Sequence, residues 1–220
     1  PTASRRDLAV ARSLDPARAR AEKRVERFLD AAVELMSASP DREFTVAEVV
    51  ERSGQSLRSF YQYFAGKHEL LLALFEGAVQ TTADRLEVAI SAIDDPLERL
   101  RTFTDEYYRL CRPGATGRTP KQRKVPASTV IADFAQRLLT GHPSEAAIAF
   151  SPLMTMLRDL LDDAAAAGAI RPDLDHQQIA GVVLQAVMFN AFADTISASS
   201  LDADAAAAGL WDLLLHGLTP

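Results

Sequence analysis

The hydrophobic positions of this chain recur at the three- and four-residue spacing of α-helices almost from end to end. The first predicted helix shows this in apolar residues spaced three, four and three apart: Val25, Phe28, Ala32 and Leu35. Asp15–Pro16 predicts its start, because aspartate is a good N-cap and proline fits the first helical position. No clear run of alternating polar and apolar residues predicts a strand, so we expect an all-α fold.

Turn signals divide the next stretch into short helices. Thr45 and Glu48 have the spacing of a capping box, which predicts a helix that ends before Ser53–Gly54. Ser56 is placed to cap a third helix over residues 57–64. Two short helices joined by a tight glycine turn, after a longer helix, are typical of a helix-turn-helix.

A larger helical region follows. A long amphipathic helix is predicted from Lys67 to about Ile93. Further helices are predicted at about residues 96–111, 127–140, 144–167, 175–198 and 203–217. We therefore expect three parts: a basic, flexible arm over residues 1–15, a helix-turn-helix domain over residues 16–66 and a helical domain over residues 67–220.

Charge is distributed unevenly along the chain. The net charge is −6, yet residues 1–67 hold 12 basic and 10 acidic side chains, against 12 and 20 in residues 68–220. A basic N-terminal segment on an acidic protein is expected where one end meets phosphate, although a solvated tail gives the same pattern. Cys111 is the single cysteine, so no internal disulfide is possible. Without a secretory signal or an 18-residue apolar run, we expect a cytoplasmic protein with no membrane partner.

The block from Phe60 to Leu70 is the most specific motif. It places an aromatic pair, a two-residue break and Lys67 ahead of an apolar helix. Earlier positions of the same pattern are Phe28, Ala31, Ala32, Leu35, Phe44, Thr45, Val46, Val49, Val50, Ser53, Gly54 and Ser56. With these residues, positions 24–75 resemble the DNA-binding domain of the tetracycline-repressor (TetR) family. Gln55, Leu57 and Arg58 depart from the family's usual residues, which bears on the DNA sequence recognised rather than on the fold.

The resemblance implies a homodimeric transcriptional regulator with a ligand pocket in its C-terminal region. Regulators of this kind are most often repressors, released from a pseudo-palindromic operator in double-stranded DNA by a small-molecule effector. We therefore interpret residues 67–220 as a ligand-binding and dimerisation domain.

Candidate DNA-binding residues lie at the helix-turn-helix and just after it. Arg58 has the donors to pair with guanine, and Gln62 can pair with adenine. Lys67 opposes the dipole of its own helix unless an external phosphate lies there. The full set is Thr45, Ser56, Leu57, Arg58, Ser59, Tyr61, Gln62, Tyr63 and Lys67.

Structural roles remain alternatives for several of these residues: a solvated surface arginine for Arg58, core packing for Tyr61 and a simple helix cap for Thr45. For the N-terminal arm, we hypothesise that Arg5, Arg6 or Arg12 enters the minor groove of DNA. The alternative is that the arm is disordered.

The helical domain contains large methionine and aromatic side chains that could line a pocket, and broad apolar stripes that could form a dimer interface. Methionine and aromatic residues suit a cavity for a hydrophobic effector, and equally an ordinary core. The pocket candidates are Phe103, Tyr107, Cys111, Phe134, Phe150, Met154, Leu157, Met188, Phe189 and Phe192. The dimer candidates, on the last two helices, are Val183, Ala186, Val187, Asn190, Leu210, Trp211 and Leu214. For these the alternative is an internal core.

Catalytic patterns are absent from the sequence. The four histidines are scattered, and no spacing suits a metal site, a nucleophile or a phosphate loop. Asp159, Asp162 and Asp163 are better explained as a solvated face than as metal ligands. We expect no enzyme activity, metal or cofactor. Two other classes remain open: a helical small-molecule-binding protein or enzyme without DNA function, and a protein-interaction adaptor indifferent to Arg58→Ala and Lys67→Ala.

Overall fold

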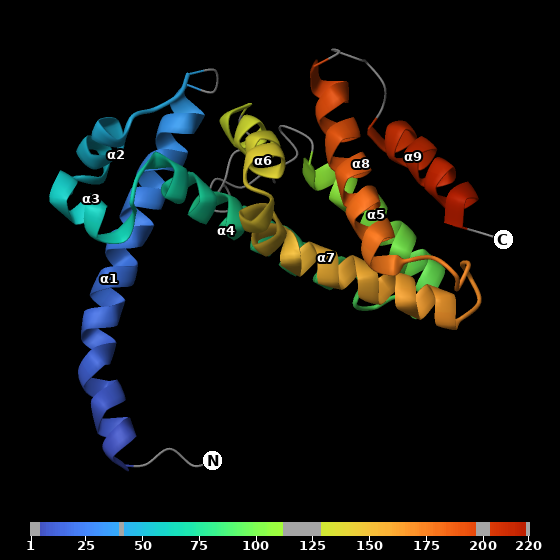
Figure 1. Ribbon diagram of the computed structural model, residues 1–220, viewed down its shortest axis with the longest axis horizontal. Coiled ribbons are helices and arrows are strands. Elements are labelled where there is room, and N and C mark those ends of the chain that lie inside the picture. The colour runs from blue at the N-terminus through green and yellow to red at the C-terminus, as the bar shows by residue number, and fades with distance from the viewer. Residues whose placement is uncertain (1–4, 40–41, 112–128, 197–202, 219–220) are drawn as a thin grey trace. The chain divides into compact units, whose positions relative to one another are not determined.

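The computed structural model describes residues 5–39, 42–111, 129–196 and 203–218, with the backbone alone at 5–15, 129–130, 132–133, 192–196 and 203. Throughout these ranges the regular elements are α-helices, which confirms the predicted all-α fold (Figure 1). They are α1 (Arg5–Ala38), α2 (Val46–Ser53), α3 (Leu57–Tyr63), α4 (Lys67–Ile90), α5 (Pro96–Cys111), α6 (Thr129–Gly141), α7 (Pro143–Ala166), α8 (His176–Ile196) and α9 (Ala203–Leu218). None of the described helices is both long enough and apolar enough to cross a membrane.

The start of α1 differs from the prediction. The helix begins at Arg5, before the predicted start at Asp15–Pro16, and Pro16 lies inside it. Proline removes one backbone hydrogen bond from a helix interior but does not always end the helix. The carbonyl of Pro16 accepts a hydrogen bond from the Arg20 side chain at 3.0 Å. The side chains of Arg5, Arg6 and Arg12 lie outside the described residues.

The chain forms two compact units, residues 1–73 and 74–220. The division falls inside α4 rather than at its first residue. Leu70 and Leu71, in the first turns of α4, are buried and belong to the first unit. The helix-turn-helix unit therefore includes the beginning of α4.

The core of the first unit is a cluster of aromatic rings. Phe28 of α1 meets Phe60 edge-on, with ring centroids 5.4 Å apart, and lies 6.2 Å from Phe64. Phe60 and Phe64 are themselves 5.4 Å apart and buried. These contacts fix one face of α3 against α1, because edge-to-face aromatic packing is directional.

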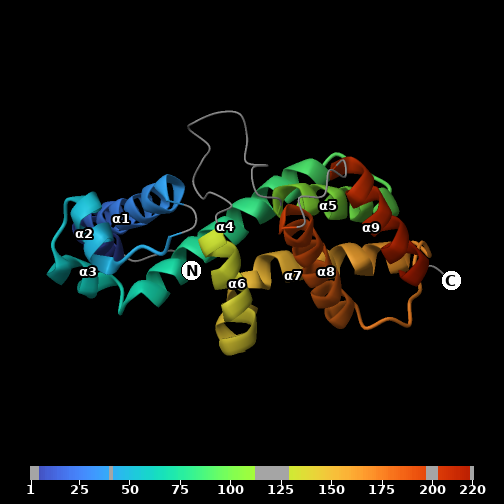
Figure 2. The same ribbon diagram turned by 90° about the horizontal axis from the view of Figure 1, so that it is seen from above.

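The second unit is organised around α5, which packs against α7, α8 and α9 (Figures 1 and 2). One face of α5 is buried through Leu100, Phe103, Thr104, Tyr107 and Tyr108. Helix α7 also packs against α6 and α8.

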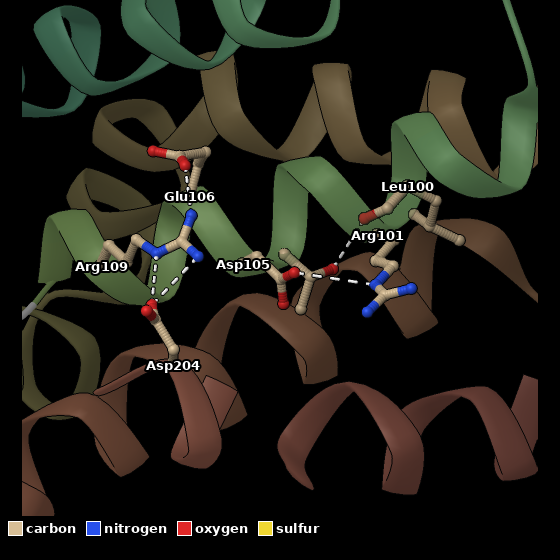
Figure 3. Close-up of polar contacts among 7 residues, drawn as sticks. Leu100, Arg101, Asp105, Glu106, Arg109 and Asp204 are labelled. Carbon is tan, nitrogen blue, oxygen red and sulfur yellow. Dashed lines mark hydrogen bonds and ion pairs between the residues drawn. The ribbon is translucent and has the colours of Figure 1, made fainter. Parts of the chain in front are cut away.

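Ion pairs at the edges of the second unit join α5 and α7 to their neighbours. Arg109 of α5 contacts Asp204 of α9 at 3.1 Å and also pairs with Glu106 of its own helix (Figure 3). Asp163 of α7 pairs with Arg99 of α5 at 3.0 Å. The acidic residues at the end of α7 thus include partners in helix packing.

Candidate nucleic-acid interface and ligand pocket

The helix-turn-helix is built by local capping. The predicted capping box is confirmed: the Thr45 hydroxyl accepts a hydrogen bond from the Glu48 backbone, and the Glu48 carboxylate accepts one from the Thr45 N–H at 2.8 Å. Hydrogen bonds from Arg42 and Thr45 lower the pKa of Glu48 to about 2. Helix α2 ends at Gly54, whose φ of +65° lies in the left-handed region that glycine favours.

The turn is also tied to α1. The Gln55 amide donates a hydrogen bond to the Arg24 carbonyl at 2.9 Å. Ser56 then caps α3, with its hydroxyl accepting from the Ser59 N–H at 3.1 Å. Gln55 is therefore a structural residue in the turn, a role that the local sequence pattern did not reveal.

Helix α3 presents two side-chain stripes to its surroundings. Arg58 and Gln62 are exposed, and neither makes a hydrogen bond or ion pair with another described side chain. Leu57 and Tyr61 lie on the adjacent stripe and are 50% and 57% exposed. Ser59 and Tyr63 are half-buried, and Phe60 faces the core. The predicted DNA-binding residues of α3 are thus mostly accessible.

Lys67 is held at the start of α4 by an acidic partner. Its Nζ lies 2.8 Å from Glu43 Oε2 and 4.9 Å from the centroid of the Phe44 ring. The Lys67 side chain is 26% exposed. Glu43 already supplies the anion expected from an external phosphate. The contact also brings Lys67 close to the segment that leads into Thr45.

A pocket of about 450 Å³ lies in the second unit between α6, α7 and α8. Its apolar lining includes three predicted pocket residues: Phe150, Met154 and Met188. Arg158 and Gln177 supply polar groups, and Arg158 is paired with Asp159 at 2.8 Å. The remaining lining residues are Leu139, Pro143, Ala146, Ala147, Ser151, Thr155, Gly181, Leu184 and Gln185.

The other predicted pocket residues lie elsewhere in the second unit. Buried residues that do not line this pocket are Phe103, Tyr107, Phe134 and Leu157. Cys111 is half-buried; burial raises the pKa of its thiol to about 12, against the effect of a hydrogen bond with Tyr107. Phe189 is 43% exposed. The Phe192 side chain lies outside the described residues.

The predicted dimer residues divide into core and surface. Val183, Val187 and Trp211 are buried within the single chain, so their side chains already contribute to its own core. Half-buried members are Ala186, Leu210 and Leu214, and Asn190 is exposed. The exposed apolar side chains of α8 and α9 are others: Val182 at 54%, Phe189 and Leu213 at 71%. The spacing of apolar residues did not separate these two groups.

Comparison with known proteins places the N-terminal unit in a family. Residues 28–74 match the family described as bacterial regulatory proteins, tetR family. Over 83 residues the chain is 26% identical to an uncharacterised HTH-type transcriptional regulator, YvdT, from Bacillus subtilis. This match covers 38% of the chain and 43% of that relative, so it spans less than half of the relative's length.

Solved structures extend the likeness to most of the chain. The transcriptional regulator FadR from Bacillus subtilis, in complex with stearoyl-CoA, aligns with a TM-score of 0.64 at 17% identity over 87% of this chain and 97% of that one. The ketosteroid transcriptional regulator KstR2 of Mycobacterium tuberculosis aligns with a TM-score of 0.55 at 21% identity, over 90% and 95%. At these identities the likeness shows a common fold.

Proposed function

We propose that this chain is a ligand-responsive repressor of the TetR family, whose family pattern residues 28–74 match, and that it binds a pseudo-palindromic operator through α3. The observation that carries this proposal is the division of α3 into a buried face, with Phe60, and an outer face with Arg58 and Gln62, which have no partner among the described side chains. A recognition helix needs this combination, because one face fixes its position while the other reaches base edges. Action on chromosomal DNA would place the protein in the cytoplasm.

Two copies of α3 would read the two half-sites. A homodimer formed through the exposed apolar residues of α8 and α9 supports this arrangement, since Val182, Phe189 and Leu213 keep much of their apolar surface in water within the described chain. The half-sites would then lie about 34–36 Å apart, one turn of DNA.

The effector we propose is a hydrophobic molecule with at least one polar group. Phe150, Met154 and Met188 offer it an adaptable apolar surface, while Arg158 and Gln177 can bind its polar end. The solved relative in complex with stearoyl-CoA and the ketosteroid regulator are consistent with effectors of this general kind.

Helix α4 is the proposed connection between pocket and DNA. Phe75 of α4 lies 5.2 Å from Phe150, a pocket residue, and 6.1 Å from Phe134, measured between ring centroids. The same helix begins with Lys67. An effector that displaces Phe150 would act on Phe75 and so on α4. To weaken operator binding 100-fold, it must bind the two states with free energies about 2.7 kcal/mol apart.

Selection of bound fragments from random double-stranded DNA, near 150 mM salt, tests the DNA-binding function. The wild-type protein should enrich a pseudo-palindrome, and Arg58→Ala should relax the preference at one or two base positions. Arg85→Ala, on α4, is the control because it removes an arginine outside the proposed interface. Failure to enrich any sequence, repeated after unfolding and refolding to remove bound effector, would overturn the proposal. The pocket would then support the alternative function, that of a helical small-molecule-binding protein without a DNA function.

Filling the pocket tests the effector site separately. A Cβ atom at Gly181 would lie 3.8 Å from Met154 Cε, an ordinary contact, so Gly181→Leu would place its bulk in the pocket. We expect this variant to lose binding of the apolar anionic dye 1-anilinonaphthalene-8-sulfonate. Gly77→Leu, where a Cβ meets open space, should bind as the wild type does. Equal binding by both variants would contradict the assignment of this pocket.

A further inference from the structure

Leu57 is an apolar residue at an exposed position, so packing within the chain does not explain why a leucine stands there. It is 50% exposed and lies on the stripe of α3 that also carries Tyr61, one turn later. The aromatic core of the first unit is made by Phe28, Phe60 and Phe64, on the other face of α3. Half of Leu57 therefore remains in water in the free protein.

The surroundings of Leu57 restrict what can cover it. Arg58 is the next residue along the helix, exposed and without an ion-pair partner among the described residues, and Gln62 lies one turn later. A partner that covered Leu57 with an apolar protein surface would bring Arg58 towards the same low-dielectric surface, where an unpaired charge is costly.

The major groove of DNA satisfies both side chains. It offers guanine acceptors to Arg58, and its base edges present one apolar group, the C5 methyl of thymine. Neighbouring stripes on one helix reach neighbouring base pairs in the groove. An apolar side chain beside an arginine therefore suits a DNA sequence in which a thymine lies next to a guanine.

We propose that Leu57 packs on the C5 methyl group of a thymine in each half-site, beside the guanine contacted by Arg58. This inference rests on the proposed DNA-binding function and adds a specificity-determining residue to it. Leu57 discriminates by an apolar contact, and its preference is for the methyl group rather than for a hydrogen-bonding pattern.

Uracil substitution isolates this contact, because uracil keeps every base-pairing and groove hydrogen-bonding atom of thymine and lacks only the methyl group. In the selected operator, each thymine is replaced by uracil in turn. Affinity is then measured for the wild type, Leu57→Ala, Leu57→Met and Val88→Ala. Val88 is the control, an exposed aliphatic residue of α4.

For the wild type, one thymine position in each half-site should lose about fourfold in affinity per methyl group removed, the effect of withdrawing one methyl-sized contact. Leu57→Ala should bind thymine and uracil equally at that position. Leu57→Met, which keeps an apolar contact, and Val88→Ala should retain the discrimination.

Three results would overturn the inference while DNA binding itself persists. They are the same affinity for thymine and uracil at every position, the same uracil penalty in Leu57→Ala as in the wild type, and selected half-sites that contain no thymine. If selection enriches no DNA sequence at all, the proposed function fails and this inference fails with it.

Discussion

At the scale of single residues, the proposed DNA interface contains a charge that is already neutralised. Lys67 must leave Glu43, 2.8 Å away, before it can bind a phosphate. An exposed ion pair of this kind contributes about 0.2–1 kcal/mol. If Lys67 contacts phosphate as proposed, Glu43 would reduce the affinity that Lys67 gives to any DNA and would favour binding that also uses base contacts.

Replacement of Glu43 by glutamine should raise affinity for DNA of unrelated sequence by up to about fivefold, since Lys67 no longer exchanges one anion for another. Titration of wild type and variant on a nonspecific duplex at several salt concentrations measures this effect. Glu51→Gln removes a charge of the same sign from an exposed position of α2 and should change the affinity for DNA less. Equal gains from both variants would mean that net charge alone is responsible.

Asp105 of α5 provides a test that concerns stability rather than DNA. Burial raises the pKa of its carboxyl above the ordinary 3.8, against the effect of Arg101 and Arg109 (Figure 3). Its Oδ1 is buried without a hydrogen-bond partner among the described atoms. Because the folded-state pKa is raised, the stabilising contribution of the protonated carboxyl is complete below pH 3.8 and is lost as the pH rises through the folded-state value.

Asp105→Asn should therefore unfold at a higher temperature than the wild type at pH 7, with the difference shrinking as the pH falls towards 3.8. Thermal unfolding followed by circular dichroism across this pH range measures it. Asp173→Asn, at an exposed position, is the control and should change little. A variant less stable than the wild type at pH 7 would show that Arg101 and Arg109 outweigh the burial of Asp105.

At the scale of elements, the short helices of the first unit depend on caps and on packing. A helix as short as α3 is unstable alone in water, because nucleation costs more than a few hydrogen bonds return. Ser56 caps its first turn, and Phe60 and Phe64 hold it against Phe28 of α1. The buried positions of α3 thus maintain the helix, while its exposed positions remain available for the proposed base contacts.

Helix α4 belongs to both units, and its Phe75 contacts the pocket residue Phe150. Phe75→Leu should leave operator binding and effector binding measurable while it reduces the effect of one on the other by about 2- to 30-fold, equivalent to 0.5–2 kcal/mol. Operator affinity measured with and without effector gives the coupling directly.

The control for Phe75→Leu is Phe103→Leu, a similar change in the buried face of α5 that does not line the pocket. It should reduce stability and leave the coupling unchanged. The proposed connection would be wrong if both variants altered the coupling equally, because the effect would then follow from stability alone.

At the scale of the whole molecule, the proposed dimer explains why apolar residues remain exposed on α8 and α9. Phe189→Glu combined with Leu213→Glu should convert a dimer to the 23.9 kDa monomer, because two charges per subunit would be buried without partners. Light scattering measures the mass, and operator affinity should fall with it. Val88→Glu, at an exposed position of α4, should remain dimeric. A wild-type protein that is monomeric at micromolar concentration would remove the dimer from the proposal.

The sequence by itself determined the elements of this protein, because helix periodicity and capping are local properties. Thr45 and Glu48 are three residues apart, and the structure forms the capping box that this spacing predicts. The outer face of α3 followed from the same local geometry. The start of α1 was the exception, because Pro16 lies within a continuing helix.

Only the tertiary structure decided which apolar and charged residues meet. Helix α8 is apolar around much of its circumference, so its sequence could not distinguish buried Val183 from exposed Val182. Lys67 pairs with Glu43 across 24 positions, and Gln55 binds the Arg24 carbonyl across 31. Such partners are brought together by the packing of helices, which no local spacing encodes, and this is why core, pocket and surface could be separated only in three dimensions.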